Sequence, residues 1–142
     1  MDYLSPYSIG MDVSMIETPA LLLDLNVMEK NISEMAKYFN SKPAWIRPHI
    51  KNHMSPFIAH KQIDAGAVGV FYQTVAEAEI MAYSGINDIL IANEVIGRSK
   101  IRRLLNLTRH THMMVAVDNL LNVNELSEAA TKKKVTELSQ SE

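Results

Sequence analysis

The sequence of 142 residues contains no cysteine. Disulfide bridges and thiolate metal sites are therefore excluded, and the absence fits a protein of a reducing compartment. Long apolar runs are also missing, so no segment is expected to cross a bilayer. The N-terminal stretch MDYLSPYSIGMD lacks the basic and then apolar pattern of a signal peptide. We therefore predict a soluble, cytoplasmic protein.

Neither sign of charge is in clear excess. Lys and Arg number 14 and Asp and Glu 16, which gives a net charge of −2. This balance gives no electrostatic reason to expect nucleic acid or a membrane surface as a partner. Glycine is scarce, with five residues, and no G-x-G-x-x-G motif is present, which argues against a dinucleotide-binding fold. The length and the hydrophobic content of 47% fit one globular domain.

From residue 17 onward, short apolar runs alternate with segments of helical periodicity. Runs that are apolar throughout are typical of parallel strands covered by helices. Strands are expected at 20–25, 44–50, 67–72, 88–93 and 112–118, each followed by a helix. The helix starts are supported by capping signals at Asn26, at Ser55-Pro56, at Thr74 with Glu77, and at Asn119. The sequence therefore predicts an α/β fold of repeated β-α units.

The spacing of these units favours a (β/α)8 barrel over a doubly wound sheet, without excluding the latter. Strand starts at Trp45, Val68, Ile89 and Met113 lie 23, 21 and 24 residues apart. A complete barrel needs eight units and about 250 residues. The chain offers about half a barrel, so we expect a fragment or a truncated product. An open sheet closed by a second copy of the chain, as a homo-oligomer, is the alternative.

The domain organisation expected from these patterns has three parts. Residues 1–17 form an N-terminal extension, 18–131 the partial barrel, and 132–142 a polar tail. The tail begins where another apolar strand would be due in a longer barrel.

Polar residues follow the expected strands where each strand ends. Lys51, Gln73, Asn93 and Asp118 would converge at one edge of a parallel sheet, where chemistry sits in such folds. A simple alternative is that strand ends are polar because loops are solvated.

The run RPHIKNH, residues 47–53, is the most informative segment. Alternation along a strand places Trp45, Arg47, His49 and Lys51 on one face, which would point into the barrel. A lysine amine that is desolvated or close to other cations becomes a nucleophile able to form Schiff bases with carbonyls. A metal pair of His49 and His53 is the rival interpretation, but that spacing suits a helix and Pro48 disfavours one.

Longer stretches of the sequence resemble a known group of enzymes. The segments TPALLLDLNVMEKNI, RPHIKNHMSPFIAHKQIDAGAVGV, TVAEAEIMAYSGINDILIANEVIG and VAVDN are similar to the D-threonine aldolase and D-serine dehydratase group. These are fold-type III enzymes that use pyridoxal 5′-phosphate (PLP), with a barrel like the N-terminal domain of alanine racemase. The similarity extends from about Thr18 to Ala130, and R-P-H-x-K-x-H is its most specific part.

The resemblance implies roles for individual residues. Lys51 would carry PLP as a Schiff base, and its neighbours Arg47, His49, Gln73 and Asn93 would bind the cofactor. His53 would lie at the substrate. The 20–25 segment would pack outside the barrel. Asn52 and Met54 depart from the threonine and lysine that the family often carries at those positions.

The resemblance also implies a reaction and further components. We expect a PLP-dependent lyase that cleaves D-3-hydroxy amino acids to glycine and an aldehyde, with the activity of this chain alone uncertain. The family uses a divalent metal bound by a C-terminal domain, and this sequence offers no ligands for it. The alternatives are a D-serine dehydratase-type lyase, a non-catalytic PLP-binding module, and an inactive truncation product.

Overall fold

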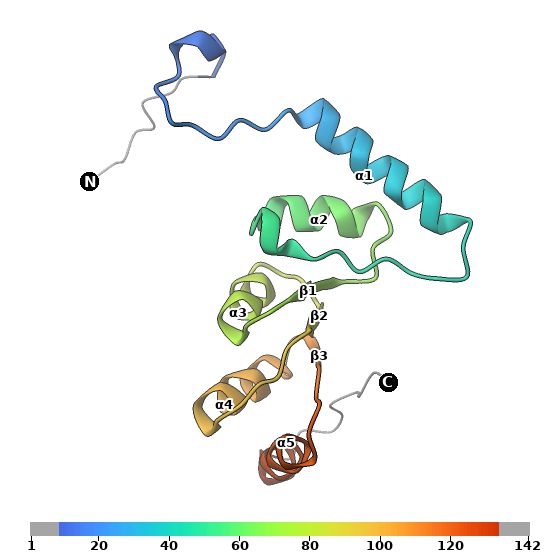
Figure 1. The fold of residues 1–142 in the computed structure, drawn as a ribbon, viewed down its shortest axis with the longest axis vertical. Coiled ribbons are helices and arrows are strands. Elements are labelled where there is room, and N and C mark those ends of the chain that lie inside the picture. The colour runs from blue at the N-terminus through green and yellow to red at the C-terminus, as the bar shows by residue number, and fades with distance from the viewer. Residues whose placement is uncertain (1–8, 134–142) are drawn as a thin grey trace.

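A computed structural model describes residues 9–133 of the chain. Three short strands, β1 (Val70–Tyr72), β2 (Asp88–Ile91) and β3 (His112–Val115), form a parallel sheet in the order β1-β2-β3. The helices α3 (Val75–Tyr83), α4 (Arg98–Leu107) and α5 (Leu120–Lys133) follow the three strands in turn. All three helices lie on the same side of the sheet (Figure 1). The predicted alternation of strand and helix is confirmed.

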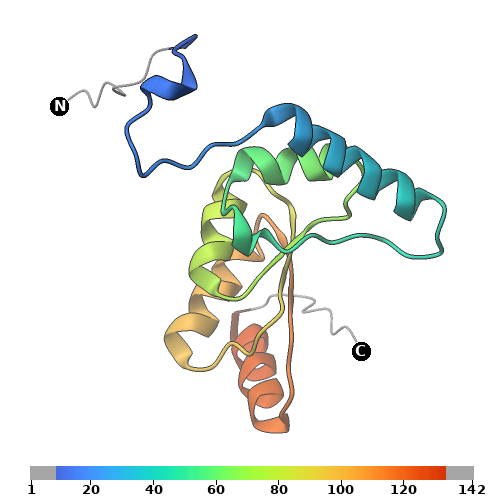
Figure 2. The ribbon, with the colours of Figure 1, turned by 45° about the horizontal axis from the view of Figure 1, so that its top comes forward.

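The N-terminal part adds two more helices. They are α1 (Leu25–Asn40) and α2 (Pro56–Asp64), together with two 3-10 turns, η1 (Val13–Met15) and η2 (Ile50–Asn52). α1 runs beside α2 (Figure 2), and an ion pair of 2.6 Å joins Lys61 of α2 to Glu29 of α1. No residue of α1 is fully buried. α1 is therefore attached at the margin of the fold.

Local capping explains where several helices begin. The Thr74 hydroxyl accepts from the backbone N–H of Glu77, and the Glu77 carboxylate accepts from the backbone N–H of Thr74 at 3.0 Å. Such a reciprocal pair satisfies two N–H groups that the helix itself leaves unpaired. The Ser55 side chain caps α2, with Pro56 in its first turn, and Asn119 Oδ1 accepts from Leu121 N–H at 2.8 Å. These three predicted caps are confirmed.

The hydrophobic core lies between the sheet and the helices. Alternate strand residues are buried, as expected when one face of a sheet is covered. The buried set from the strands and turns comprises Ile50, Val70, Tyr72, Ile89, Ile91, Met113 and Val115. It packs against residues of α3, α4 and α5 that include Val75, Ala78, Met81, Ile101, Leu104, Leu105, Leu126 and Ala130.

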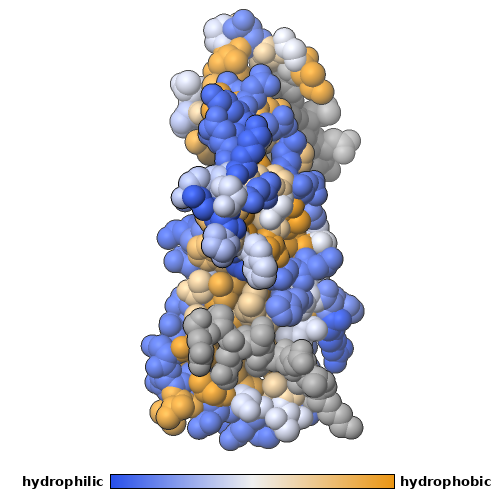
Figure 3. Space-filling view, turned by 90° about the vertical axis from the view of Figure 1, so that its right-hand side faces the viewer, coloured by the Kyte–Doolittle hydropathy of each residue, from blue (hydrophilic) through white to orange (hydrophobic). Residues whose placement is uncertain are grey.

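The opposite face of the sheet is not covered by any helix among residues 9–133. Phe71, Leu90 and Met114 lie on it and are only half-buried. Viewed from this side, hydrophobic residues gather along the middle of the molecule between hydrophilic margins (Figure 3). In a (β/α)8 barrel this face would be the interior. The sheet of the described residues is not closed, so the chain forms part of a barrel, as predicted.

The expected strand at 20–25 is wrong. The segment has no regular structure and pairs with no described strand, and its leucines are exposed, Leu21 completely. Asp24 ends it by accepting from Val27 N–H at 3.0 Å, so the helix begins at Leu25 rather than after Asn26. An apolar run predicts a buried strand only where a neighbouring strand is available to pair with it.

The expected strand at 44–50 is only partly formed. Its regular pairing is limited to one bridge between His49 and Phe71. Pro48 has no N–H to donate, and the following residues turn into η2. Trp45 was expected on the inward face but is 85% exposed, because the segment joins the sheet only from the carbonyl of Ile46 onward.

Two remaining expectations concern the ends of the chain. α5 continues through Lys132 and Lys133, which were assigned to the polar tail, and residues 134–142 lie outside the described residues. Of the N-terminal extension, residues 1–8 lie outside them too. Between residues 9 and 133, no helix combines the length and the apolar character that a membrane span requires.

Candidate functional site

Side chains on the open face of the sheet form rows across the strands. In the middle row, Phe71 pairs in register with Leu90, and Leu90 with Met114. His49 joins this row through its bridge to Phe71, and the two rings lie with their centroids 4.1 Å apart. The row therefore presents two adjacent rings and two aliphatic side chains to the open side.

The row nearer the amino ends of the strands is charged. Arg47 Nη1 lies 2.6 Å from Asp88 Oδ1, and His112 Nδ1 lies 3.4 Å from the other carboxylate oxygen. These side chains come from the 44–49 segment, β2 and β3, two positions before the middle row on each. Arg47 was expected to be a cationic neighbour of Lys51. The structure instead pairs its charge with Asp88.

The row at the carboxyl ends of the strands holds the lysine. Lys51 and Gln73 lie two positions after His49 and Phe71, and both are exposed. Ala92 and Ala116 occupy the matching positions after β2 and β3. Both alanine side chains are small and occupy little space at this edge. Lys51 and Gln73 therefore both follow the open-face residues at the carboxyl ends of their segments. Because residues 50–52 form the turn η2, the placing of the Lys51 side chain on the open face stays a prediction.

His49 fixes the backbone of Lys51. Its Nδ1 accepts from the Lys51 N–H at 3.1 Å and caps the turn η2. Because Nδ1 is an acceptor, a neutral His49 ring carries its proton on Nε2. The imidazole is therefore held between the Phe71 ring and the lysine backbone, with one N–H available as a donor.

His53 is held in a different way. Its Nδ1 accepts from Ser55 N–H at 3.0 Å, while Nε2 is buried without a hydrogen bond among the described residues. The buried Oε1 of Gln62 in α2 also lacks a donor. Burial lowers the pKa of His53, against smaller raising effects of Gln62 and the Ser55 backbone. His53 therefore belongs to the junction of η2 and α2 as a neutral ring.

This environment predicts how stability depends on pH. The folded chain holds a proton on His53 less readily than the unfolded chain, whose histidine keeps the ordinary pKa of 6.5. As the pH falls below about 6.5, the unfolded state gains protons first, so stability is full above that pH and declines below it. We expect urea unfolding of His53→Gln to lose less stability than the wild type between pH 7.5 and 5.5. His110→Gln, at an exposed position, is the control, and an equal loss in the wild type and His53→Gln would contradict the assignment.

The other predicted residues lie in loops after the strands. Asn93 is exposed, and its Oδ1 accepts from Glu94 N–H at 3.1 Å. Asp118 is exposed just before α5. Both lie beyond the carboxyl ends of their strands, at the same end of the sheet as Lys51. The Asn93 side chain is thus turned to its own backbone rather than to the middle row.

Three residues near the site were not predicted. Asp88 holds Arg47, and Gly69 leaves space for that contact. Tyr72 is buried on the helix side, and its hydroxyl has no hydrogen-bond partner among residues 9–133. Burial together with the charge of Glu77 raises the pKa of Tyr72 well above the ordinary value. In the sequence, Asp88 stands at the start of an apolar run, a position that indicates only a strand boundary.

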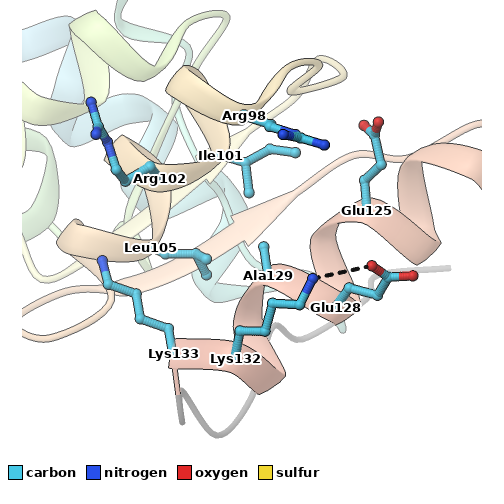
Figure 4. A pocket seen from close by; sticks show the side chains of 9 residues that line it. All are labelled: Arg98, Ile101, Arg102, Leu105, Glu125, Glu128, Ala129, Lys132 and Lys133. Atoms are coloured by element: carbon cyan, nitrogen blue, oxygen red, sulfur yellow. Dashed lines mark ion pairs between the residues drawn. The ribbon is translucent and has the colours of Figure 1, made fainter.

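A separate hollow lies between α4 and α5, on the helix side of the sheet (Figure 4). Its volume is about 630 Å³. The lining residues are Arg98, Arg102, Lys132, Lys133, Glu125 and Glu128, with Ile101, Leu105 and Ala129 as the apolar part. None of the predicted site residues lines it, so the candidate site is the open face and its carboxyl end.

The described part of the chain does not form a metal-binding site. No group of three His, Asp or Glu side chains within residues 9–133 is placed to hold a metal ion. The chemistry available at the open face is that of a primary amine, an imidazole N–H and two amides. Lys51 is exposed, so the desolvation that was expected to activate its amine is not found, and a primary amine is still the group that captures a carbonyl compound covalently.

Comparison with known proteins shows where this arrangement recurs. The family model described as "Alanine racemase, N-terminal domain" matches residues 23–138. D-threonine aldolase of Arthrobacter sp. is 38% identical over 124 residues, which are 87% of this chain and 33% of that protein. 3-Hydroxy-D-aspartate aldolase of Paracoccus denitrificans is 42% identical over 125 residues, 87% of this chain and 32% of that protein.

Comparison with solved structures also finds enzymes of this group. D-threonine aldolase from Filomicrobium marinum matches with a TM-score of 0.82 and 46% identity, over 84% of this chain and 32% of that one. D-threo-3-hydroxyaspartate dehydratase from Delftia sp. HT23 matches with a TM-score of 0.77 and 28% identity, over 84% and 32%. The chain therefore spans about a third of the length of these relatives. The resemblance indicated by the RPHIKNH segment is confirmed.

Proposed function

Because the chain belongs to the family of alanine racemase N-terminal domains, we propose that it is part of a PLP-dependent lyase acting on D-3-hydroxy amino acids. The observation that carries the proposal is the place of Lys51, which is exposed just beyond the carboxyl end of the edge segment. Its backbone N–H is held by His49 Nδ1 at 3.1 Å, and the His49 ring lies beside the ring of Phe71. The relatives that match this chain are named as aldolases and a dehydratase of such substrates.

The residues present fit PLP. Lys51 offers an exposed amine that forms no ion pair with another described residue. The His49 and Phe71 rings, tilted by 44° to each other with centroids 4.1 Å apart, supply aromatic surface on the open face, and Gln73 supplies an exposed amide after β1. When bound, PLP supplies an electron sink for negative charge that develops at the substrate's Cα.

Each residue then has a proposed part. Lys51 would hold the cofactor covalently through Nζ, and the same nitrogen would take or return a proton once the substrate amine has displaced it. His49 would steady the lysine backbone through Nδ1 and face the cofactor with its Nε2–H. Gln73 and Asn93 would bind cofactor from the neighbouring strand ends, and His53 would lie toward the substrate as a neutral ring.

Retro-aldol cleavage is the proposed reaction, and dehydration is the second candidate. The two aldolase relatives match 87% of this chain, whereas the Delftia dehydratase matches 54%. In structure, the aldolase is 46% identical and the dehydratase 28%. The residues described here do not form a metal site, so no step is assigned to a metal.

The experiment is a hybrid enzyme in which this chain replaces the matching third of the Arthrobacter aldolase. We expect glycine and acetaldehyde from D-threonine, and little turnover of L-threonine. The same hybrid with Lys51→Ala is the matched control and should be inactive. Predominant 2-oxo acid and ammonia would overturn the cleavage assignment. Equal turnover of the L-isomer would overturn the stereochemical one.

A further inference from the structure

One ion pair on the open face connects elements that are far apart in the sequence. The Arg47 guanidinium lies 2.6 Å from Asp88 Oδ1 and 3.5 Å from the backbone oxygens of Val70 and Asp88. It thus passes across β1 to reach β2. Only 18% of the Arg47 side chain and 34% of the Asp88 side chain are exposed, so solvent screens this pair less than an open surface pair.

A glycine makes the crossing possible. Gly69 lies directly beneath the arginine, in the charged row between Arg47 and Asp88. A Cβ at this position would overlap Arg47 Nη1 and would lie 2.5 Å from the backbone oxygen of Asp88. Any larger residue at 69 would therefore displace the guanidinium or push β1 away from β2.

Apart from the Arg47 ion pair, few hydrogen bonds hold the segment that carries Arg47, and Ile50 at its end is completely buried in the core. Two backbone hydrogen bonds hold the segment to the β1 side, Val68 N–H to Ile46 O and Phe71 N–H to Pro48 O, each of 3.0 Å. Pro48 cannot donate a further bond, and Lys51 follows in a short turn capped by His49. The position of Lys51 along the sheet therefore depends on what fixes this edge segment.

We propose that Arg47 and Asp88 are positioning residues that fix the register of the lysine-bearing segment. Asp88 holds Arg47, Arg47 fixes the strand face that carries His49, and His49 holds the Lys51 backbone. Within this assignment, only the role of Lys51 rests on the proposed function. It differs from a direct contact of Arg47 with the cofactor, because the guanidinium lies on the far side of His49 from Lys51.

The first test needs no cofactor. In the full chain, Arg47→Met and Gly69→Ala are expected to speed amide hydrogen exchange at Val68 and Phe71 about tenfold or more. Exchange at Ala116, whose N–H bonds to Ile91 O between β3 and β2, should stay unchanged. Arg103→Met is the matched control, since it breaks the comparable Arg103–Glu79 pair between α3 and α4. It should lower thermal stability without changing exchange at Val68 or Phe71.

The second test uses PLP at less than one equivalent, with borohydride reduction and peptide mass mapping. Arg47→Met should lower the share of label on Lys51 several-fold, and Arg103→Met should not. Unchanged exchange at Val68 and Phe71, or faster exchange with unchanged selectivity for Lys51, would overturn the proposal. If the wild type shows no preference for Lys51, the proposed function fails. The exchange result then supports or overturns the register role by itself.

Discussion

Replacing Lys51 with alanine should abolish stable PLP capture by this chain. The expected change is from about one reduced PLP per chain to background, because only an amine can form the covalent link to the cofactor. The other lysines of residues 9–133 lie on α1, α2, α4 and α5 or, for Lys42, in the loop after α1. Several are engaged with neighbouring side chains, as Lys61 is with Glu29 and Lys132 with Glu128. Intact-protein mass spectrometry after borohydride reduction measures the effect.

The matched controls are Lys61→Ala and Lys132→Ala. Both remove a lysine from the helix side or margin of the fold and should retain PLP at the wild-type level. A Lys51→Ala chain that still captures PLP in full would show that the open face is not the cofactor site.

Replacing Ile91 with alanine should destabilise the fold by about 2–5 kcal/mol. Ile91 is completely buried on the helix side of the central strand, so the substitution leaves a cavity in the core. Leu90→Ala, the adjacent residue on the open face, should cost half of that or less, because Leu90 is only half-buried. Urea denaturation with a check for equal m-values measures both changes.

The comparison of the two variants also reports on what covers the open face. Equal costs for Ile91→Ala and Leu90→Ala would show that Leu90 is fully buried in solution. A second copy of the chain closing the sheet would have this effect, and light scattering would then give a mass above that of the monomer.

The parts of the fold that were predictable depend on local signals. The capping pair of Thr74 and Glu77 and the Ser55-Pro56 start act within a few residues, so sequence alone is sufficient. The strand at 20–25 was not predictable, because an apolar run does not reveal whether another strand lies beside it. The same limit applies to 44–50, where Pro48 and an edge position reduce regular pairing to one bridge.

The site was predictable along one strand but not between strands. Alternation placed Arg47 and His49 on one face, since that rule needs only the sequence of the segment. It does not reach Lys51, because residues 50–52 form the turn η2. The contact of Arg47 with Asp88 spans 41 residues and depends on the register of three neighbouring segments. The need for a glycine at position 69 follows from the same register. Neither the Arg47–Asp88 contact nor the need for glycine at position 69 could be inferred from the sequence without the arrangement of the strands.

The central claim is that the charged face of the RPHIKNH segment anchors the cofactor through Lys51. The most direct measurement is peptide mapping of the wild-type chain after exposure to limiting PLP and reduction with borohydride. The account predicts that the label lies mainly on Lys51. Label spread over the lysines in proportion to their exposure, or concentrated on Lys132 and Lys133, would contradict it.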